Sequence, residues 1–197
     1  MPDSSSSSVA GHLAQARALN GAGRYEEALW VLNGAPRPDA CHVEVLTERG
    51  FAHNGLKRFD LAIRDLDEAI GRAPRHAPAW HNRGYAHDGA GQPGRALRDL
   101  DEAIRLDPAF PDAYNGRGHA RAGLGDHAGA LADYGQALRL NPDFASALNN
   151  RGCAHAALGA HDQALRDFDA ALSLRPGYAA AARGREASVK ALARAAF

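Results

Sequence analysis

The sequence contains few of the residues that build covalent cross-links or nucleophilic active sites. Only two of its 197 residues are cysteines, Cys41 and Cys153, and they are not spaced as a CxxC pair. Neither a disulfide nor a structural zinc is therefore expected. Thr47 is the only threonine, and no GxSxG motif is present. These absences argue against a disulfide-stabilised domain and against a serine hydrolase.

Long apolar runs and an excess of one charge are also missing. No window approaches 18 consecutive apolar residues, and the N-terminal stretch MPDSSSSSVAGHLAQ has neither the basic nor the apolar region of a signal peptide. Lys plus Arg and Asp plus Glu number 23 each, so no net charge attracts nucleic acid or anionic lipid. We therefore expect a cytoplasmic protein that binds neither nucleic acid nor membranes.

What the sequence does contain is an internal repeat of 34 residues. Residues 77–110 recur as 43–76, 111–144 and 145–178, with a degenerate copy at 9–42. When each copy is numbered from 1 to 34, small residues recur at positions 8, 20 and 27 and proline recurs at position 32. The residues at position 8 are Ala16, Gly50, Gly84, Gly118 and Gly152. Small residues allow two antiparallel helices to approach closely, and proline stops the second helix before the next copy begins.

Each copy is predicted to form two helices, helix A over positions 2–14 and helix B over positions 18–30. In helix B, apolar residues such as Leu165, Phe168 and Leu172 have the spacing of one buried face. Residues 1–8 are expected to be a disordered serine-rich tail, because they offer nothing apolar to bury. Residues 179–197 are expected to form one helix that covers the last copy.

This helix-turn-helix pattern resembles the tetratricopeptide repeat (TPR) over residues 9–178. The resemblance implies an all-α fold, a right-handed superhelical α-solenoid of five TPR repeats. The expected segments are the tail 1–8, the repeats 9–42 (degenerate), 43–76, 77–110, 111–144 and 145–178, and the C-terminal capping helix 179–197. The resemblance also implies a non-catalytic adaptor that binds a partner protein or an extended peptide in a concave groove lined by helix A.

In proteins of this family, positions 2, 5, 6, 9, 12 and 13 of helix A line the groove. The expected partner-binding residues are Thr47, Phe51, Asn54, His81, Asn82, Tyr85, Asn115, His119, Asn149 and Asn150. The Asn, Thr and His side chains can hydrogen-bond to the backbone of an extended peptide, and the two aromatic rings can anchor its side chains.

One known use of the family's groove is a carboxylate clamp that holds an acidic chaperone tail. The clamp requires Lys, Asn, Asn, Lys and Arg at five groove positions. The residues at these positions, starting from the second copy, are Thr47, Phe51, Asn82, Asp112 and Gly116. Only Asn82 agrees with the clamp, so we expect no binding of an EEVD-like tail.

Charged residues recur in register as well. Position 7 is Arg49, Arg83, Arg117 and Arg151, and position 23 is Asp65, Asp99, Asp133 and Asp167. This pairing predicts one Arg–Asp bridge per repeat. The bridge joins helices A and B of one repeat or links one repeat to the next, and the sequence leaves both arrangements open.

No metal or cofactor is expected. No two of the ten histidines are three or four residues apart, and His53, His87 and His155 share position 11, too far apart on successive helices to share an ion as a full ligand set. We expect these histidines to pack or hydrogen-bond. The GxGxxG spelled by residues 89–94 falls in a turn between two helices, without the strand that a dinucleotide site needs.

Two other functions stay open. An exposed end repeat could make the protein a homodimer with a structural role. A more remote possibility is an enzyme or metal site at the groove, where His119 and Cys153 both occupy position 9. That site would hold zinc and lose it in the His119→Ala variant.

Overall fold

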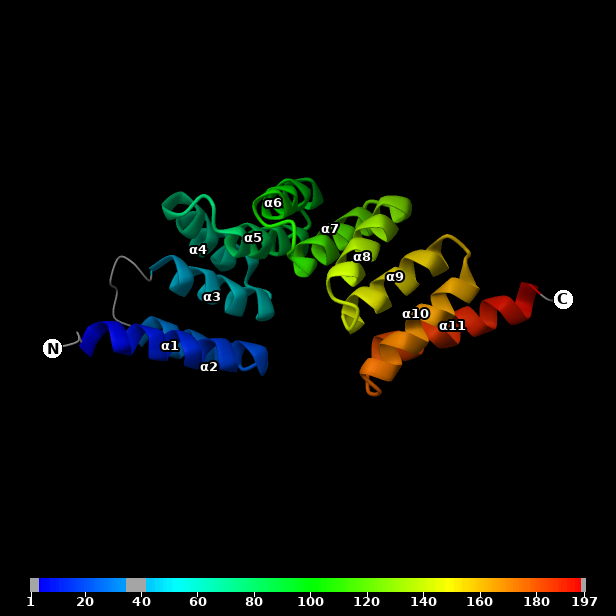
Figure 1. Cartoon of the computed structure of the whole chain (residues 1–197), viewed down its shortest axis with the longest axis horizontal. Helices are drawn as coiled ribbons and strands as arrows, with labels where there is room; N and C mark the ends of the chain where they lie inside the picture. Colours follow the sequence, from blue (N-terminus) through cyan, green and yellow to red (C-terminus); the bar gives the residue numbers. More distant parts are fainter. Residues whose placement is uncertain (1–3, 35–41, 196–197) are drawn as a thin grey trace. The chain divides into compact units, whose positions relative to one another are not determined.

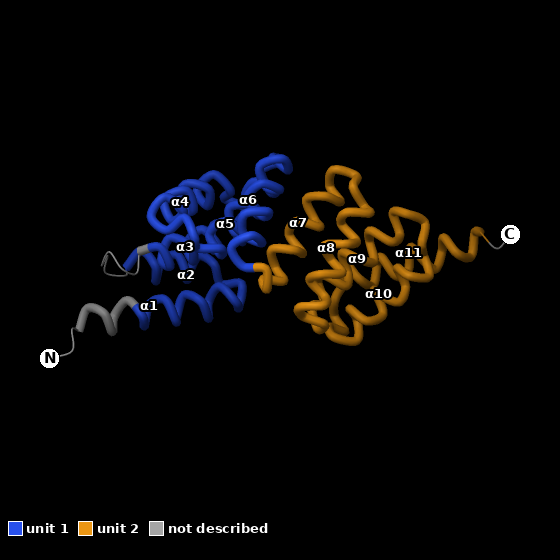
Figure 2. The backbone as a smooth tube through the Cα atoms, turned by 45° about the horizontal axis from the view of Figure 1, so that its top comes forward, with its two compact units in different colours: residues 1–107 blue, residues 108–197 orange. Residues whose placement is uncertain are grey.

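The computed structural model describes residues 4–34 and 42–195, and all regular secondary structure in these two ranges is α-helical (Figure 1). The helices follow one another in pairs and group into two compact units, residues 1–107 and 108–197 (Figure 2). The prediction of an all-α fold built from helix pairs is confirmed.

Unit 1 contains three pairs in which an A helix is followed by a B helix. The A helices are α1 (Ser4–Gly21), α3 (His42–Gly55) and α5 (Ala77–Gly89), and the B helices are α2 (Tyr25–Gly34), α4 (Phe59–Arg72) and α6 (Pro93–Leu106). Because α1 begins at Ser4, residues 4–8 are helical where the sequence predicts a tail, and residues 1–3 lie outside the described ranges. Extending an existing helix by one residue costs far less than starting one, which explains the difference.

Unit 2 contains two pairs and a terminal helix. The pairs are α7 (Pro111–Gly123) with α8 (His127–Leu140) and α9 (Ala145–Ala157) with α10 (His161–Leu174), and they are followed by α11 (Ala179–Ala195). Each B helix of this unit ends two residues before a position-32 proline, Pro142 or Pro176. Residues 179–195 of the predicted capping segment are helical, and residues 196–197 lie outside the described ranges.

Close packing within each pair depends on the small residues of position 8. A Cβ atom added to Gly84 would lie 2.8 Å from Cγ of Leu100, and one added to Gly118 would lie 2.7 Å from Cε1 of Tyr134. Gly50 and Gly152 meet the position-24 side chains of their own B helices in the same way. The alanines of position 20 are fully buried in all five copies. Helix A can approach helix B this closely only because it carries no side chain at the crossing point.

The turn between helices A and B requires a left-handed backbone at position 15. Gly23, Gly91, Gly125 and Gly159 have φ between 72° and 84° there, and Lys57 has φ 57°. Glycine adopts this conformation without the clash that a Cβ causes, so Lys57 is the strained member of the column. Gly91 is also the middle glycine of the GxGxxG sequence, which confirms that this motif is a helix–helix turn.

The predicted Arg–Asp bridges form in all four complete repeats and join helix A to helix B. Arg83 donates from Nε and Nη2 to the two carboxylate oxygens of Asp99, each at 2.8 Å. The same bidentate contact joins position 7 to position 23 in the other three repeats. Arg83 also donates from Nη1 to Asp67 of α4 at 2.6 Å. Bridges within a repeat and between repeats are therefore both present.

Candidate functional site

Two exposed aromatic rings lie at the same repeat position on neighbouring A helices of unit 1. Phe51 on α3 and Tyr85 on α5 both occupy position 9, and they are 39% and 55% exposed. The α3 and α5 helices pack against each other. On α2, Tyr25 meets Phe51 edge to face, with ring centroids 6.3 Å apart, and so holds that ring in place. Both predicted anchors are therefore exposed, at the same repeat position of two packed helices.

A charged network lies between α1 and α3. Arg17, the position-9 residue of α1, donates from Nε to Glu48 at 2.9 Å and from Nη2 to Glu44 at 3.1 Å. Asn20 donates from Nδ2 to the side chain and to the backbone carbonyl of Glu48. One guanidinium is shared by two carboxylates, so this end of the face carries net negative charge.

Three of the predicted contact residues of unit 1 are buried between helices. Thr47 donates from its hydroxyl to the carbonyl of Val43, one turn earlier in α3, at 2.7 Å. Asn54 donates from Nδ2 to the backbone carbonyl of Asn82 at 2.8 Å, and the Asn82 side chain lies 3.1 Å from Nδ1 of His81. Only the Asn54 side chain joins α3 to α5, whereas Thr47 and the Asn82 side chain bond within their own helices. Among the polar contact residues predicted in unit 1, only His81 is partly exposed and can reach a partner protein.

In unit 2 the predicted residues form an amide cluster between α7 and α9. Asn150 donates from Nδ2 to the side-chain carbonyl of Asn115 at 3.1 Å, and Asn149 donates to Asn150 at 3.3 Å. Asn149 is buried, whereas Asn115 and Asn150 are partly exposed and His119 is exposed. The cluster therefore offers two amides and one imidazole to a partner.

The remaining position-9 residue of unit 2, Cys153, is a free thiol. Desolvation by neighbouring atoms raises the pKa of this thiol above its ordinary value. A protonated thiol is a poor nucleophile and a poor metal ligand at neutral pH. Cys41, the other cysteine, lies outside the described ranges.

The position-11 histidines lie against the Arg–Asp bridges and not against one another. Nε2 of His53, His87 and His155 is 3.7–3.8 Å from the position-23 aspartate of the same repeat. In the fourth copy Arg121 takes this place, with Nη1 2.8 Å from Oδ2 of Asp133. Desolvation lowers the pKa of His53 and of His155. Within residues 4–34 and 42–195, no group of three or more His, Cys, Asp or Glu side chains is placed to hold a metal ion.

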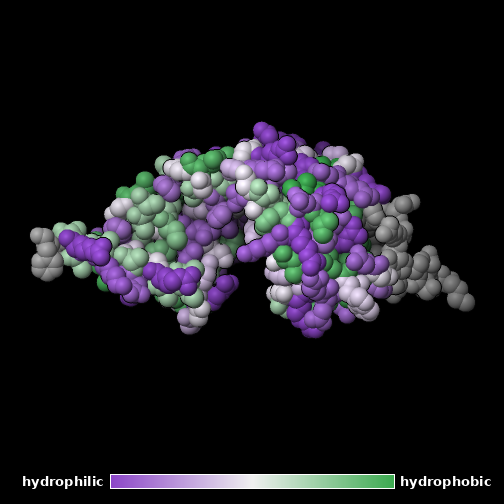
Figure 3. Space-filling model, turned by 180° about the vertical axis from the view of Figure 1, so that it is seen from behind, coloured by the Kyte–Doolittle hydropathy of each residue, from purple (hydrophilic) through white to green (hydrophobic). Residues whose placement is uncertain are grey.

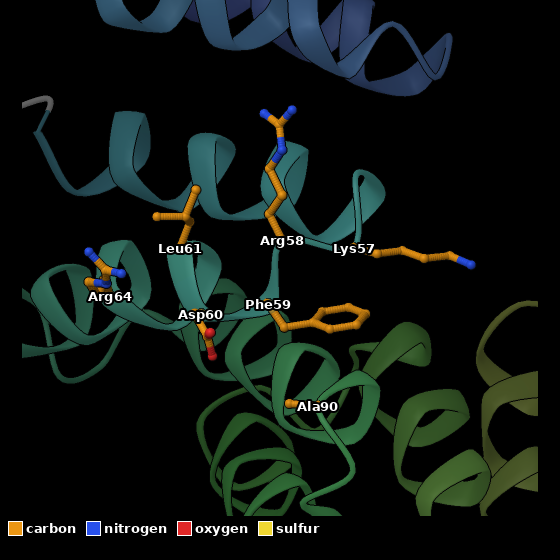
Figure 4. Close-up of a pocket in the computed structure, with 7 residues that line it drawn as sticks. All are labelled: Lys57, Arg58, Phe59, Asp60, Leu61, Arg64 and Ala90. Carbon is orange, nitrogen blue, oxygen red and sulfur yellow. The ribbon is translucent and has the colours of Figure 1, made fainter.

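A hollow of about 530 Å³ lies where α4 begins (Figure 4). It is lined by Lys57, Arg58, Phe59, Asp60, Leu61, Arg64 and Ala90. Arg58 extends toward α2, where it pairs with Glu26 at 2.6 Å, and the ring of Phe59 extends toward the start of the next turn at Ala90. A Cβ added to Gly89 would clash with that ring. The hollow is therefore part of the junction between two repeats.

The rest of the surface is mixed in character. Green apolar and purple hydrophilic residues are interspersed in both units on the face drawn in Figure 3. The largest exposed aromatic residue is Trp30 on α2, which is 80% exposed. None of the described helices combines the length and apolarity needed to cross a bilayer.

Sequence comparisons place these repeats in a known family. The tetratricopeptide repeat matches at residues 77–110 and again at 145–178, and the TPR repeat matches at residues 118–159. No curated protein sequence matches the chain significantly. Together with the helix pairs, these matches show that the chain belongs to the tetratricopeptide repeat proteins.

Several solved structures share the fold. A thermophilic TPR protein from Thermus thermophilus is 24% identical and superposes with a TM-score of 0.78 over 92% of this chain and 97% of that chain. MamA is 24% identical, with a TM-score of 0.64 over 82% and 94% of the two chains. The first TPR of Spaghetti, bound to an HSP90 peptide, is 26% identical, with a TM-score of 0.58 over 59% and 93%. A TPR fold supports a general role in protein interaction.

Proposed function

We propose that the protein is a non-catalytic adaptor that binds an extended peptide of a partner protein across the A-helix face of unit 1. The proposed architecture is five TPR repeats over residues 9–178, followed by α11 as the capping helix. The observation that carries the proposal is the pair of exposed rings, Phe51 and Tyr85, at one repeat position on two neighbouring helices.

The spacing of these rings suits an extended chain. Packed helices are about 8–10 Å apart. A peptide in the polyproline II conformation advances about 3.1 Å per residue and has three residues per turn, so side chains three residues apart lie on one side of it and would meet successive rings. Burying the exposed part of each ring contributes on the order of 1 kcal/mol. The Arg17–Glu44–Glu48 network between α1 and α3 and the partly exposed His81 of α5 supply polar contacts.

In unit 2 the exposed amides of Asn115 and Asn150 and the ring of His119 are proposed as a second contact region. These groups lie on the A helices α7 and α9 and can pair with the N–H and C=O groups of a peptide backbone. Such contacts hold a backbone without selecting side chains. We therefore assign side-chain selection to the aromatic pair of unit 1.

The bound ligand is not expected to be an acidic chaperone tail. Of the residues at the five clamp positions only Asn82 agrees, and in the structure Asn82 is buried between α3 and α5. An HSP90 peptide such as the SRMEEVD ligand of the Spaghetti TPR is therefore predicted not to bind. Micromolar binding of this peptide in isothermal titration calorimetry would refute the prediction.

The proposed function is tested by capture of partners from native cell extract with immobilised protein. The wild type is compared with a Phe51→Ala, Tyr85→Ala double variant, and with Trp30→Ala as a matched control, because Trp30 is an exposed aromatic on a B helix. We expect the double variant to lose the bound protein and the control to keep it. If only the Trp30→Ala variant loses the bound protein, the binding surface includes Trp30 on α2 and not the two rings.

Self-association is the competing function, and light scattering on the same proteins separates the two. A monomeric wild type is consistent with the adaptor. A dimer that dissociates in the Phe51→Ala, Tyr85→Ala double variant would mean that this face binds a second copy of the chain. That result would replace the adaptor with a homodimer.

A further inference from the structure

The terminal helix α11 packs on α10 as a sixth A helix would (Figures 1 and 2). When the repeat numbering is continued past residue 178, Arg185 falls at position 7, and its Nε donates to Asp169 of α10 at 2.5 Å. Arg83 makes the corresponding contact with Asp67 of α4. Ala181 and Ser188 are buried at positions 3 and 10, which are also buried in the complete repeats. One side of α11 therefore follows the packing of the repeats.

The side of α11 that would face a sixth B helix is open. A hollow of about 590 Å³ lies there between α10 and α11, and no helix within the described ranges covers it. It is lined by Leu172, Pro176, Ala182, Arg185, Glu186 and Val189. Ala182 occupies position 4, where the complete repeats have Leu, Trp or Tyr, and the smaller side chain leaves space for an apolar group from outside. The volume is in the range that binds ligand side chains.

Arg185 has hydrogen-bonding capacity that the fold does not use. In all four complete repeats the position-7 arginine gives Nε and Nη2 to the aspartate of its own B helix. Arg185 gives Nε to Asp169, and neither Nη1 nor Nη2 has a partner among the described residues. Its side chain is 49% exposed and lines the hollow. A carboxylate is the group that this position binds elsewhere in the molecule.

The backbone of α11 shows why no B helix returns over this face at the usual place. The left-handed turn between A and B helices falls at position 15, which is Ala193 in α11. Ala193 is helical, and α11 continues to Ala195 through the region in which the repeats turn. The described chain, up to Ala195, therefore places no B helix over the hollow.

We propose that the hollow between α10 and α11 binds an acidic amphipathic helix of a partner protein, with a carboxylate on Arg185 and an apolar side chain over Ala182 and Val189. Glu186, the carboxylate of the lining, is paired with Lys190, and Arg194 of the same helix has no ion-pair partner among the described residues, so the charge around the hollow favours an acidic ligand. Glu186 stands where the repeats have glycine, so the bound helix lies toward Ala182 and not at the close crossing of a regular B helix. This site does not depend on the peptide face of unit 1.

The test uses a labelled synthetic peptide with the sequence of residues 59–72, FDLAIRDLDEAIGR. This sequence forms the amphipathic B helix α4, and its four acidic residues exceed its two arginines. Fluorescence anisotropy with the full chain is expected to show saturable binding that Arg185→Gln weakens at least about tenfold, because hydrogen bonds to a charged group are lost. Ala182→Trp, which fills the hollow, is expected to weaken binding as strongly. Arg183→Gln is the matched control, with an expected loss below about threefold.

Three outcomes would overturn the proposal. The first is the absence of saturable binding by the wild type, and the second is an equal loss in Arg183→Gln and Arg185→Gln, which would indicate unspecific attraction. The third is a dimer, seen by light scattering, that dissociates in the Ala182→Trp variant, because the hollow would then belong to a second copy. The Phe51→Ala, Tyr85→Ala variant should bind this peptide normally, so failure of the peptide face in unit 1 is distinguishable from failure here.

Discussion

Replacing Arg83 by leucine should destabilise unit 1 far more than removing an ordinary surface ion pair. Arg83 makes three charge-assisted hydrogen bonds, two to Asp99 and one to Asp67. Asp99 is only 5% exposed, and after the substitution the ring of His87, with Nε2 3.7 Å from Oδ2, would remain beside it. Leaving a buried charge without its partner costs about 3–5 kcal/mol. Since the ring of His87 stays beside Asp99, we expect a cost at the lower end of this range, about 3 kcal/mol.

The assay is thermal and urea unfolding followed by circular dichroism of the helices. A loss of about 3 kcal/mol corresponds to a fall in Tm of roughly 10–20 °C for a unit of about 100 residues. Arg72→Leu is the matched control, because Arg72 forms an exposed pair with Glu68 in α4 and should cost less than about 1 kcal/mol. The Arg83→Leu, Asp99→Leu double variant should recover most of the loss, since it removes the buried charge together with its partner. The reasoning is refuted if Arg83→Leu is no more destabilising than Arg72→Leu.

Three further predictions concern glycines and histidines. Lys57→Gly should raise the free energy of unfolding by about 1 kcal/mol in urea titration, because glycine relieves the left-handed strain, and an unchanged midpoint would contradict this. Gly84→Ala should destabilise by about 1–3 kcal/mol through overpacking. Gly135→Ala, whose added Cβ would meet only Nη1 of Arg139 at 3.9 Å, should stabilise by about 0.5–1 kcal/mol, and equal shifts would contradict the packing argument. Desolvation lowers the pKa of His53 and of His155, so the folded state prefers the neutral rings. The stability that the neutral rings contribute is therefore present above the unfolded pKa of about 6.5, and it is lost as the pH falls through the folded pKa values. The Tm of a His53→Gln, His155→Gln variant should therefore fall less than that of the wild type between about pH 7.5 and about pH 5, and parallel curves would contradict the assignment.

The periodic features of this protein could be predicted from its sequence because each depends on spacing along one helix pair. Glycine at position 8, alanine at position 20 and proline at position 32 each act within a stretch of 34 residues, and the predicted helices A and B agree with the observed ones to within a few residues. The Arg–Asp pairing was also predictable, since both columns recur in register. The start of α1 at Ser4 was not, because its first residues have no pattern of their own.

Which of the predicted groove residues are exposed depends on how the helices pack, and this could not be predicted from the sequence. Asn54 and Asn82 lie between α3 and α5 and Asn149 is buried in unit 2, whereas Phe51 and Tyr85 remain accessible on the same helices. The sequence periodicity gives the angle of each side chain around its helix, but burial depends on how closely the neighbouring helix approaches. The same holds for Arg185, which shares position 7 with the bridge arginines yet lines an open hollow. Its repeat position follows from counting residues, but its free donors follow from the absence of a described helix across from it.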